Sequence, residues 1–327
     1  MIQAASEAAP GRPRVCREGE VTIIMVSYNT RELTIKAIET LLENAGDASM
    51  RIIVWDNDSQ DGSAAAIAGR FPQIETIAHG ENLGFAEANN RVAAMADSEW
   101  LLLLNPDTET HPRAVEALLA FGKAHPEAGI TGGRTVYPDG SLNIGSCWNR
   151  MTALSLFCSA FGIHRLLPNS EIFNSEAIGG WKRDSVRQVD IVVGCFFLIR
   201  RELWEDLGGF NSRYNMYGEE ADMCLRAAAK GYRPMITPDA QIMHLLGAAS
   251  KKREDKTVRL LRAKTTLIRD HWPALIRPLG VALVGLGIAN RYAAARLAAL
   301  AGKKDNVAYW RNVWKARRTW LAGYPRG

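Results

Sequence analysis

Clusters of acidic residues in this chain stand where chemistry on a phosphorylated substrate would need them. Asp56 and Asp58 follow one apolar segment, Asp107 follows another, and residues 219–222 carry three further acids. Hard divalent cations such as Mg²⁺ bind carboxylates together with substrate phosphates. The alternatives are an ordinary Asx-Pro turn at Asp107 and, for residues 219–222, acids that stabilise the positive end of a helix. The repetition of the pattern favours a site for a cation and a polar sugar.

The elements that must position these acids are predicted strands. Residues 100–104 read Trp-Leu-Leu-Leu-Leu, which predicts a strand buried on both faces of a sheet. The strand must end at Asn105-Pro106, because proline has no N–H to donate to a neighbouring strand. Further strands are predicted at residues 21–27, 51–55, 74–78, 189–199 and 234–243. In an open α/β sheet ligands bind at the carboxyl ends of the strands, so acids that follow strands converge there.

Helices alternate with these strands, which predicts an α/β fold with a mostly parallel sheet. Residues 132–187 have weak periodicity and are interpreted as a variable, acceptor-facing stretch. We predict a flexible tail at 1–19, a catalytic domain at 20–250 and a basic helical extension at 251–327. The predicted helices are residues 30–42, 86–95, 111–124, 201–207, 219–230, 254–272, 274–300 and 305–321.

Composition narrows the class of protein. Five dispersed cysteines without a CxxC pair argue against a disulfide framework or a zinc site and suit a reducing cytosol. The first twenty residues contain no apolar segment of the kind found in signal peptides. No P-loop, no GxGxxG after the first strand and no GxSxG motif occurs, which disfavours kinases, dinucleotide-binding enzymes and α/β-hydrolases.

Charge is divided unevenly along the chain. Residues 251–327 contain 18 Lys+Arg and 4 Asp+Glu, a net charge of +14, whereas residues 1–250 contain 22 and 31, a net charge of −9. This asymmetry indicates an anionic partner for the extension, either nucleic acid or a membrane surface; we predict a membrane and no nucleic acid. The uncharged run between Arg277 and Arg291 is too short to span a bilayer.

The last predicted helix, residues 305–321, combines aromatic and basic side chains. Tyr309, Trp310, Trp314 and Trp320 alternate with arginines and lysines, a composition typical of helices that lie in a membrane interface. A helix docked on the protein with an exposed basic face is the alternative. The sequence leaves both interpretations open.

Five short motifs occur in one order between about residues 20 and 250. In this order they resemble family 2 glycosyltransferases of the GT-A fold, which have a Rossmann-like sheet flanked by helices. The Asn-Pro-Asp loop and the histidine before the extension resemble the bacterial rhamnosyltransferase-like branch, which acts in cell-surface polysaccharide assembly. The motifs are Val26–Asn29, Val54–Ser63, Asn82–Asn90, Leu103–Asp107 and Tyr217–Arg226.

The resemblance implies a site for a nucleoside-diphosphate sugar. Tyr28 would lie against the base, and Asp56 would accept a hydrogen bond from base or ribose. Gly84 would let the backbone of Asn82-Leu83-Gly84 approach the nucleotide. Lys251 and Lys252 would contact a diphosphate, either the donor's or that of a lipid-linked acceptor. The implied donor-binding residues are Tyr28, Asn29, Asp56, Asp58, Asn82, Gly84, Asn105, Lys251 and Lys252.

The resemblance also implies a metal and a general base. Asp107 would coordinate Mg²⁺ or Mn²⁺ on the donor diphosphate, with His244 as a further ligand. Asn105 replaces the first acid of the family's Asp-x-Asp motif, which leaves one charged ligand. Glu220 takes the position of the base that removes a proton from the acceptor hydroxyl. Glu219 and Asp222 remain alternatives for that role.

The function implied is an inverting glycosyltransferase. It would move a sugar, with rhamnose as the family-based candidate, from a nucleoside diphosphate to a lipid-linked or surface-polysaccharide acceptor. It would act in the cytoplasm, peripherally on the inner face of the membrane. The alternatives are a sugar-nucleotidyltransferase and a non-catalytic polyanion- or membrane-binding protein. The first usually has a Gly-rich loop with Lys or Arg where residues 27–30 read Ser-Tyr-Asn-Thr, and the second leaves the acids unexplained.

Overall fold

A computed structural model describes residues 2–4, 17–245, 253–302 and 306–325 of the chain. Contacts divide it into two compact units. The first comprises residues 1–147, 182–215 and 219–249, and the second comprises residues 148–181, 216–218 and 250–327. Residues 148–181, which the sequence analysis assigned to the catalytic domain, therefore pack with the C-terminal helices.

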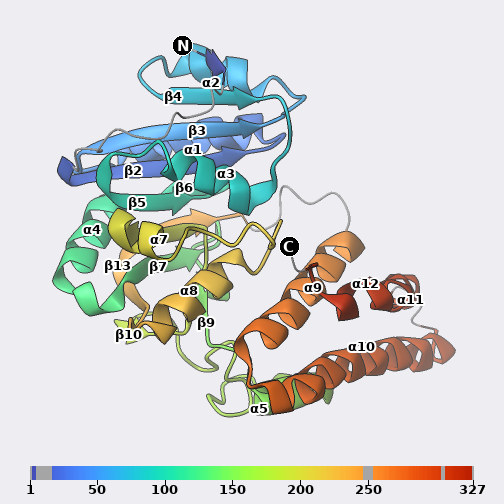
Figure 1. Ribbon diagram of the computed structural model, residues 1–327. Helices are drawn as coiled ribbons and strands as arrows, with labels where there is room; N and C mark the ends of the chain where they lie inside the picture. The colour runs from blue at the N-terminus through green and yellow to red at the C-terminus, as the bar shows by residue number, and fades with distance from the viewer. Residues whose placement is uncertain (1, 5–16, 246–252, 303–305, 326–327) are drawn as a thin grey trace. The chain divides into compact units, whose positions relative to one another are not determined.

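The first unit is built on one large sheet of strand order β1-β4-β3-β2-β5-β12-β7-β13-β10 (Figure 1). From β1 to β5 neighbouring strands run parallel, β12 is antiparallel to both β5 and β7, and β13 is parallel to β7. The strands are β1 (Ile2–Ala4), β2 (Arg17–Ser27), β3 (Met50–Asn57), β4 (Glu75–His79), β5 (Ser98–Leu104), β6 (Thr108–Thr110), β7 (Ile130–Val136), β8 (Leu142–Asn143), β9 (Cys147–Trp148), β10 (Arg187–Gln188), β11 (Ile191–Val192), β12 (Phe196–Arg200) and β13 (Met235–His244).

Helices cover both faces of this sheet. Side chains of α1, α2 and α4 share one core with alternate residues of β2 and β5, including Ile23 and Leu102. On the other face the ring centroid of Phe210 lies 6.1 Å from that of Phe85 and 6.2 Å from that of Phe197. All four leucines of β5 are almost fully buried, which confirms the predicted strand. The helices are α1 (Arg31–Glu43), α2 (Ser63–Arg70), α3 (Gly84–Ala93), α4 (Ala114–Ala124), η1 (Pro126–Ala128), η2 (Ile144–Ser146), α7 (Arg201–Asp206) and α8 (Glu219–Ala229).

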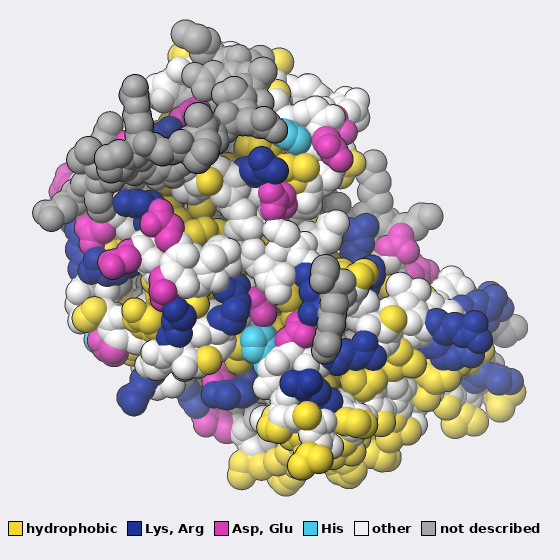
Figure 2. Space-filling model, viewed as in Figure 1, with side chains coloured by type: hydrophobic (Ala, Val, Ile, Leu, Met, Phe, Trp, Pro, Cys, Tyr) yellow, Lys and Arg dark blue, Asp and Glu magenta, His cyan; other side chains and the backbone are white. Residues whose placement is uncertain are grey.

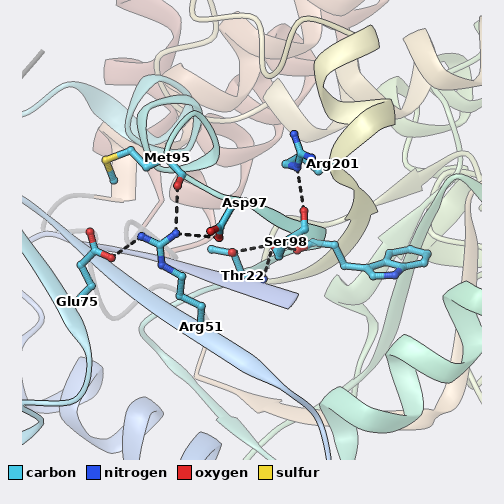
Figure 3. A network of polar contacts seen from close by, with 8 residues as sticks. Thr22, Arg51, Glu75, Met95, Asp97, Ser98 and Arg201 are labelled. Carbon is cyan, nitrogen blue, oxygen red and sulfur yellow. Dashed lines mark hydrogen bonds and ion pairs between the residues drawn. The ribbon is translucent and has the colours of Figure 1, made fainter. Parts of the chain in front are cut away.

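A polar network fixes the amino ends of the strands (Figure 3). Arg51 at the start of β3 donates to Glu75 of β4 at 2.7 Å and to Asp97 before β5 at 3.2 Å. The Ser98 hydroxyl of β5 donates to the Thr22 hydroxyl of β2 at 2.7 Å. These contacts hold four parallel strands in register at one edge, so the opposite, carboxyl edge is the edge available for a ligand.

The first unit differs from the sequence prediction in two of its regions. The predicted strand 189–199 divides into β11 and β12, and β11 lies outside the main sheet. Strand β7 was not predicted, because Gly132 and Gly133 interrupt its apolar pattern. A Cβ at Gly133 would lie 2.1 Å from the Ala240 carbonyl oxygen of β13, so the close approach of β7 and β13 requires glycine there.

The second unit is helical and has its own core. Trp320 is fully buried and donates from Nε1 to the Val313 carbonyl at 2.9 Å. Trp310 and Trp314 pack against the same core, which favours docking of the C-terminal aromatic residues on the protein. The predicted helix 305–321 is two helices. The elements are α5 (Ala153–Ala160), α6 (Ile163–Leu166), α9 (Arg253–His271), η3 (Ala274–Ile276), α10 (Arg277–Leu300), α11 (Val307–Lys315) and α12 (Arg317–Ala322).

Candidate active site

The carboxyl ends of the parallel strands meet at one edge of the sheet, as the sequence predicted. Ser27 of β2 is in register with Asp56 of β3, and Asn57 is in register with His79 of β4. Because β12 is antiparallel to β5, its first residue pairs with Leu104, the last residue of β5. The loops after β2, β3, β4 and β5 therefore open on the same edge.

The loops after β2 and β3 are tied together by hydrogen bonds. The backbone N–H of Asn29 donates to the Ser59 hydroxyl, and the N–H of Gln60 donates to Asn29 Oδ1, both at 2.8 Å. Asn29 and Asp58 have left-handed φ angles of 53° and 69°, an uncommon conformation for residues other than glycine. The Asn29 side chain thus fixes the two loops to each other, while the neighbouring Tyr28 is 47% exposed.

Asp56 is the buried acid of the loops after β2 and β3. It is 3% exposed, and its Oδ1 accepts from the Ser59 N–H at 2.9 Å. Its Oδ2 is buried and has no hydrogen-bond partner among the described residues. Burial raises the pKa of Asp56, although hydrogen bonds from Ser59 oppose the rise. Since an unsatisfied buried oxygen is costly, Oδ2 is suited to accept an N–H or O–H from a ligand.

Asn57, which the sequence analysis did not select, organises the next loop. It is 3% exposed, and its Oδ1 accepts from the Leu83 N–H at 2.9 Å. Its Nδ2 donates to Asn82 Oδ1 at 3.1 Å and to the Gly84 carbonyl at 3.2 Å. Asn82 also accepts from the Gly84 N–H at 3.0 Å. Asn82 is therefore held by hydrogen bonds within the protein. The position of Asn57, directly after an acid at a strand end, was the sequence feature that could have identified it as a site residue.

Gly84 begins α3 with a left-handed φ of 79°. A Cβ there would lie 2.5 Å from Asn215 Oδ1 and 2.7 Å from the Asn215 carbonyl. The Phe85 N–H donates to that carbonyl at 3.1 Å. In the structure the backbone of Gly84 thus lies close to Asn215, in the loop before α8. The resemblance had implied that Gly84 lets the backbone approach the nucleotide.

The loop after β5 brings Asp107 against His244, the last residue of β13. His244 Nε2 lies 3.2 Å from Asp107 Oδ1, and both side chains are buried. Burial opposes protonation of His244, but Cys195 and Asp107 outweigh it and raise the pKa of His244 to about 10. Asn105 is placed by its N–H, which donates to the Cys195 carbonyl at 3.2 Å.

This pair fits a divalent cation that is completed by the substrate. A carboxylate oxygen and a neutral imidazole nitrogen are ligands that Mn²⁺ accepts, and Mg²⁺ sites commonly use one or two carboxylates with substrate phosphates. Because the pKa of His244 is raised to about 10, its ring would have to release a proton as the cation binds. Among the described residues no group of three His, Cys, Asp or Glu side chains could hold a metal by itself. A cation bound at Asp107 and His244 would therefore need ligands from a diphosphate or from water.

The acids of α8 differ in their environments, and Glu220 is the one of the three that is only partly buried. Asp222 accepts from Arg226 Nε at 2.7 Å, and Arg226 also donates to the carbonyls of Leu207 and Gly209. Glu219 is 4% exposed, and burial, together with the charge of Glu220, raises its pKa well above the ordinary value. Glu219 is therefore protonated where an ordinary glutamate is charged.

Helix α3 fixes the loop that leads to α8. Asn90 Nδ2 donates to the Phe210 carbonyl and Asn90 Oδ1 accepts from the Phe210 N–H, both at 2.8 Å. The Ser212 hydroxyl donates to Glu87 at 2.7 Å. The loop is thus held to α3 by several hydrogen bonds before α8 begins at Glu219. Lys251 and Lys252, predicted to contact a diphosphate, lie outside the described residues.

Comparisons with known proteins identify similar chains. The profile of "Glycosyl transferase family 2" matches residues 22–208. N-acetylglucosaminyl-diphospho-decaprenol L-rhamnosyltransferase of Mycobacterium tuberculosis is 28% identical over 221 residues, which cover 62% of this chain and 69% of that protein. Rhamnosyltransferase WbbL of Escherichia coli K12 is 27% identical over 235 residues, which cover 68% and 83%.

A solved structure has the same fold. Mannosyltransferase PcManGT from Pyrobaculum calidifontis, in complex with GDP-Man and Mn²⁺, matches with a TM-score of 0.54 and 20% identity. The match covers 96% of this chain and 86% of that chain. At this identity the likeness concerns the fold alone.

Proposed function

The chain belongs to glycosyl transferase family 2, and from this premise we propose that it is an inverting, metal-dependent enzyme that uses a nucleoside-diphosphate sugar. The predictions of the family, of the GT-A fold and of glycosyltransferase activity are confirmed. The observation that carries the proposal is that Asp56 and Asp107, distant in sequence, follow strands that end at one sheet edge, while α3 holds the loop that leads to the acids of α8. The two alternatives drawn from the sequence have no support from the comparisons.

The donor nucleotide would bind at the loops after β2 and β3. Asp56 Oδ2, buried without a partner among the described residues, would accept a hydrogen bond from the base or ribose. Tyr28 is exposed and adjacent in the neighbouring loop, where its ring could stack on the base. Asn29 and Asp58 would contribute through the loop shape that their left-handed backbones create.

Asp107 and His244 would hold Mg²⁺ or Mn²⁺ on the donor diphosphate. When bound, the cation neutralises charge on the departing nucleoside diphosphate. Asn105 brings no charge to this loop, so Asp107 is its single carboxylate. We expect Asp107→Ala to abolish transfer and Asn105→Ala to weaken it, measured as kcat/KM at saturating metal.

Glu220 is the proposed general base. Asp222 forms an ion pair with Arg226, and burial, together with the charge of Glu220, raises the pKa of Glu219, which disfavours its charged form. A base must accept a proton from the acceptor hydroxyl, so a carboxyl group that is already protonated cannot serve.

The acceptor and the location are proposed from the relatives. One relative is named for a decaprenol-linked N-acetylglucosamine acceptor, and two are named rhamnosyltransferases. We infer a rhamnosyl donor and a polyprenyl-diphosphate-linked acceptor, used at the cytoplasmic face of the membrane. A lipid-linked acceptor requires the enzyme to work at a lipid surface.

The test is release of nucleoside diphosphate from a panel of nucleotide sugars, with and without polyprenyl-diphosphate-linked N-acetylglucosamine. We expect acceptor-dependent release with one donor. Glu220→Gln should lower the rate of transfer at least about a hundredfold, whereas Glu202→Gln, at an exposed first-turn glutamate of α7, should not. Near-normal transfer by folded Glu220→Gln would remove Glu220 from the role of base, and no transfer with any donor would overturn the proposed function.

A further inference from the structure

Helix α10 of the second unit is apolar on the face that it presents to solvent. Leu279 is 50% exposed, Leu286 is 39%, Leu297 is 68% and Leu300 is 87%. Their spacing places them on one side of the helix, and no charged residue occurs between Arg277 and Arg291. The other side buries Leu283, Val284 and Ile288 in the core of the unit. An ordinary surface helix has the opposite pattern, with a polar outer face.

Helix α5 repeats the pattern. Leu154, Phe157 and Phe161, spaced three and four residues apart, are 47%, 45% and 53% exposed. The rings of Phe157 and Phe161 contact each other, with centroids 4.7 Å apart. Beyond α5 the exposure of large apolar side chains continues at Leu166, Leu167, Ile172 and Phe173.

These two helices lie side by side. Asn290 of α10 donates to the Ala160 carbonyl of α5 at 3.1 Å, and Arg291 donates to the Ser159 hydroxyl at 3.1 Å. A Cβ at Gly287 would lie 3.3 Å from the Cα of Ala160, so glycine permits the close contact. Figure 2 shows hydrophobic side chains gathered over α5 and α10. We call the exposed residues of α5 and α10 the apolar face; they are Leu154, Phe157, Phe161, Leu279, Leu286, Leu297 and Leu300.

The charge of the same unit selects the kind of partner. Residues 251–327 have a net charge of +14, and residues 148–181 have two basic and two acidic side chains. Figure 2 shows Lys and Arg side chains along the border of the hydrophobic region. A protein partner would need a surface that is both apolar and negatively charged to match this unit. An anionic bilayer has both properties, an apolar interior and negative head groups. The exposed basic residues include Arg165, Arg296, Arg311, Lys315 and Arg318.

We propose that the apolar face inserts into the surface of an anionic membrane, with α5 and α10 lying in the plane of the interface. By length and composition the stretch Ala274–Leu300 is apolar enough to cross a bilayer, which corrects the expectation drawn from the shorter run between Arg277 and Arg291, and 22% of its apolar window is buried inside the protein. Its inner side packs on α9, where Gly280 of α10 meets Ile268 and Trp272. Helix α9 carries many charged residues, which are costly in hydrocarbon, so α10 lies on the membrane and does not span it.

This surface differs from the one suggested by the sequence. The aromatic residues of α11 and α12 were one candidate for membrane contact, but Trp320 is buried, and Trp310 and Trp314 are partly buried and pack against the core of the unit. In our proposal the leucines and phenylalanines of α5 and α10 therefore make the lipid contact. The basic residues of α11 and α12 would contribute attraction to anionic head groups.

The experiment is flotation of the full chain with vesicles of phosphatidylcholine alone or mixed with phosphatidylglycerol. We expect binding to the anionic vesicles. The double variant Phe157→Ser/Leu286→Ser should bind at least about tenfold more weakly, because both side chains would leave the lipid. The matched control is Leu42→Ser on α1, since Leu42 is 38% exposed and Leu286 is 39%. Arg311→Glu/Lys315→Glu should weaken binding to the anionic vesicles and leave binding to phosphatidylcholine unchanged.

Several results would overturn the proposal. Unchanged flotation of the double variant, with far-UV circular dichroism like that of wild type, would exclude the apolar face. Retention on membranes after extraction with alkaline carbonate would indicate a spanning helix. A dimer in lipid-free buffer that the double variant dissociates, without vesicle binding by wild type, would assign the face to a second copy of the chain. Binding to protein-free vesicles needs neither donor nor acceptor, so its failure would leave the proposed glycosyltransferase function untouched.

Discussion

Replacement of Glu219 by glutamine tests the protonation state on which the assignment of the base depends. Glu219 is buried at the start of α8, where desolvation and the charge of Glu220 raise its pKa well above 4.5. Glutamine has the shape of a protonated glutamate and no ionisable proton. We therefore expect Glu219→Gln to fold, to retain most of the transfer activity, and to differ from wild type in how its stability depends on pH.

The direction and size of that difference follow from proton binding. Above pH 4.5 the unfolded chain has lost the Glu219 proton, while the folded protein keeps it up to its raised pKa. The folded state then binds one more proton, so the free energy of unfolding falls by about 1.4 kcal/mol for each unit of rising pH. The stabilisation is complete below the unfolded pKa and is lost as pH rises through the folded pKa. Glu219→Gln lacks this contribution.

The assay is equilibrium unfolding in urea of both proteins at about pH 5.5 and 6.5. The stability of Glu219→Gln relative to wild type should increase as pH rises above 4.5, by at most about 1.4 kcal/mol for each pH unit. Glu202→Gln, at an exposed first-turn glutamate of α7, should show no such increase. If the curves for Glu219→Gln and wild type stayed parallel, Glu219 would be charged in the folded protein. It would then return as a candidate for the general base.

Three further substitutions have expected outcomes. Asp222→Asn removes the ion pair with partly buried Arg226 and should lower the free energy of unfolding in urea by about 3 kcal/mol, while transfer by the folded fraction continues. Gly84→Ala, at φ 79° and with a Cβ contact of 2.5 Å, should destabilise by at least about 1 kcal/mol and reduce kcat, whereas Gly80→Ala, with no atom within 4 Å, should leave kcat unchanged. Trp320→Ala, at a fully buried side chain, should lower the free energy of unfolding of the second unit by about 3–5 kcal/mol, measured by tryptophan fluorescence.

The edge of the sheet could be predicted because its signals are local. An apolar run that stops at Asn105-Pro106 defines both a buried strand and its end, and the acid that follows is then placed by geometry. The same reasoning located Asp56 after β3. Such predictions need only the period of the pattern and the residue at which it stops.

The connections between loops could not be predicted, because they join residues far apart in sequence. Asn57 holds the loop at Asn82, and Asn90 holds the loop at Phe210, through ordinary amide hydrogen bonds. An asparagine after a strand is also typical of any turn, so the sequence gives no indication of the distant partner. For the same reason Gly133 indicated a loop, although its lack of a side chain serves the contact with β13.

Through these long-range hydrogen bonds helix α3 connects two loops of the candidate active site. Its first residue, Gly84, accepts a hydrogen bond from Asn57, the last residue of β3, next to Asp56 of the proposed donor site. The Asn90 side chain of α3 hydrogen-bonds to Phe210, in the segment that leads to α8. The proposed base, Glu220, is a residue of α8. A nucleophile must meet the anomeric carbon in line with the leaving diphosphate, and a misplacement of about 1 Å can cost a hundredfold in rate. One rigid helix bonded to both loops meets that requirement better than two loops that move independently, so we infer that Asn90 aligns the proposed base with the donor.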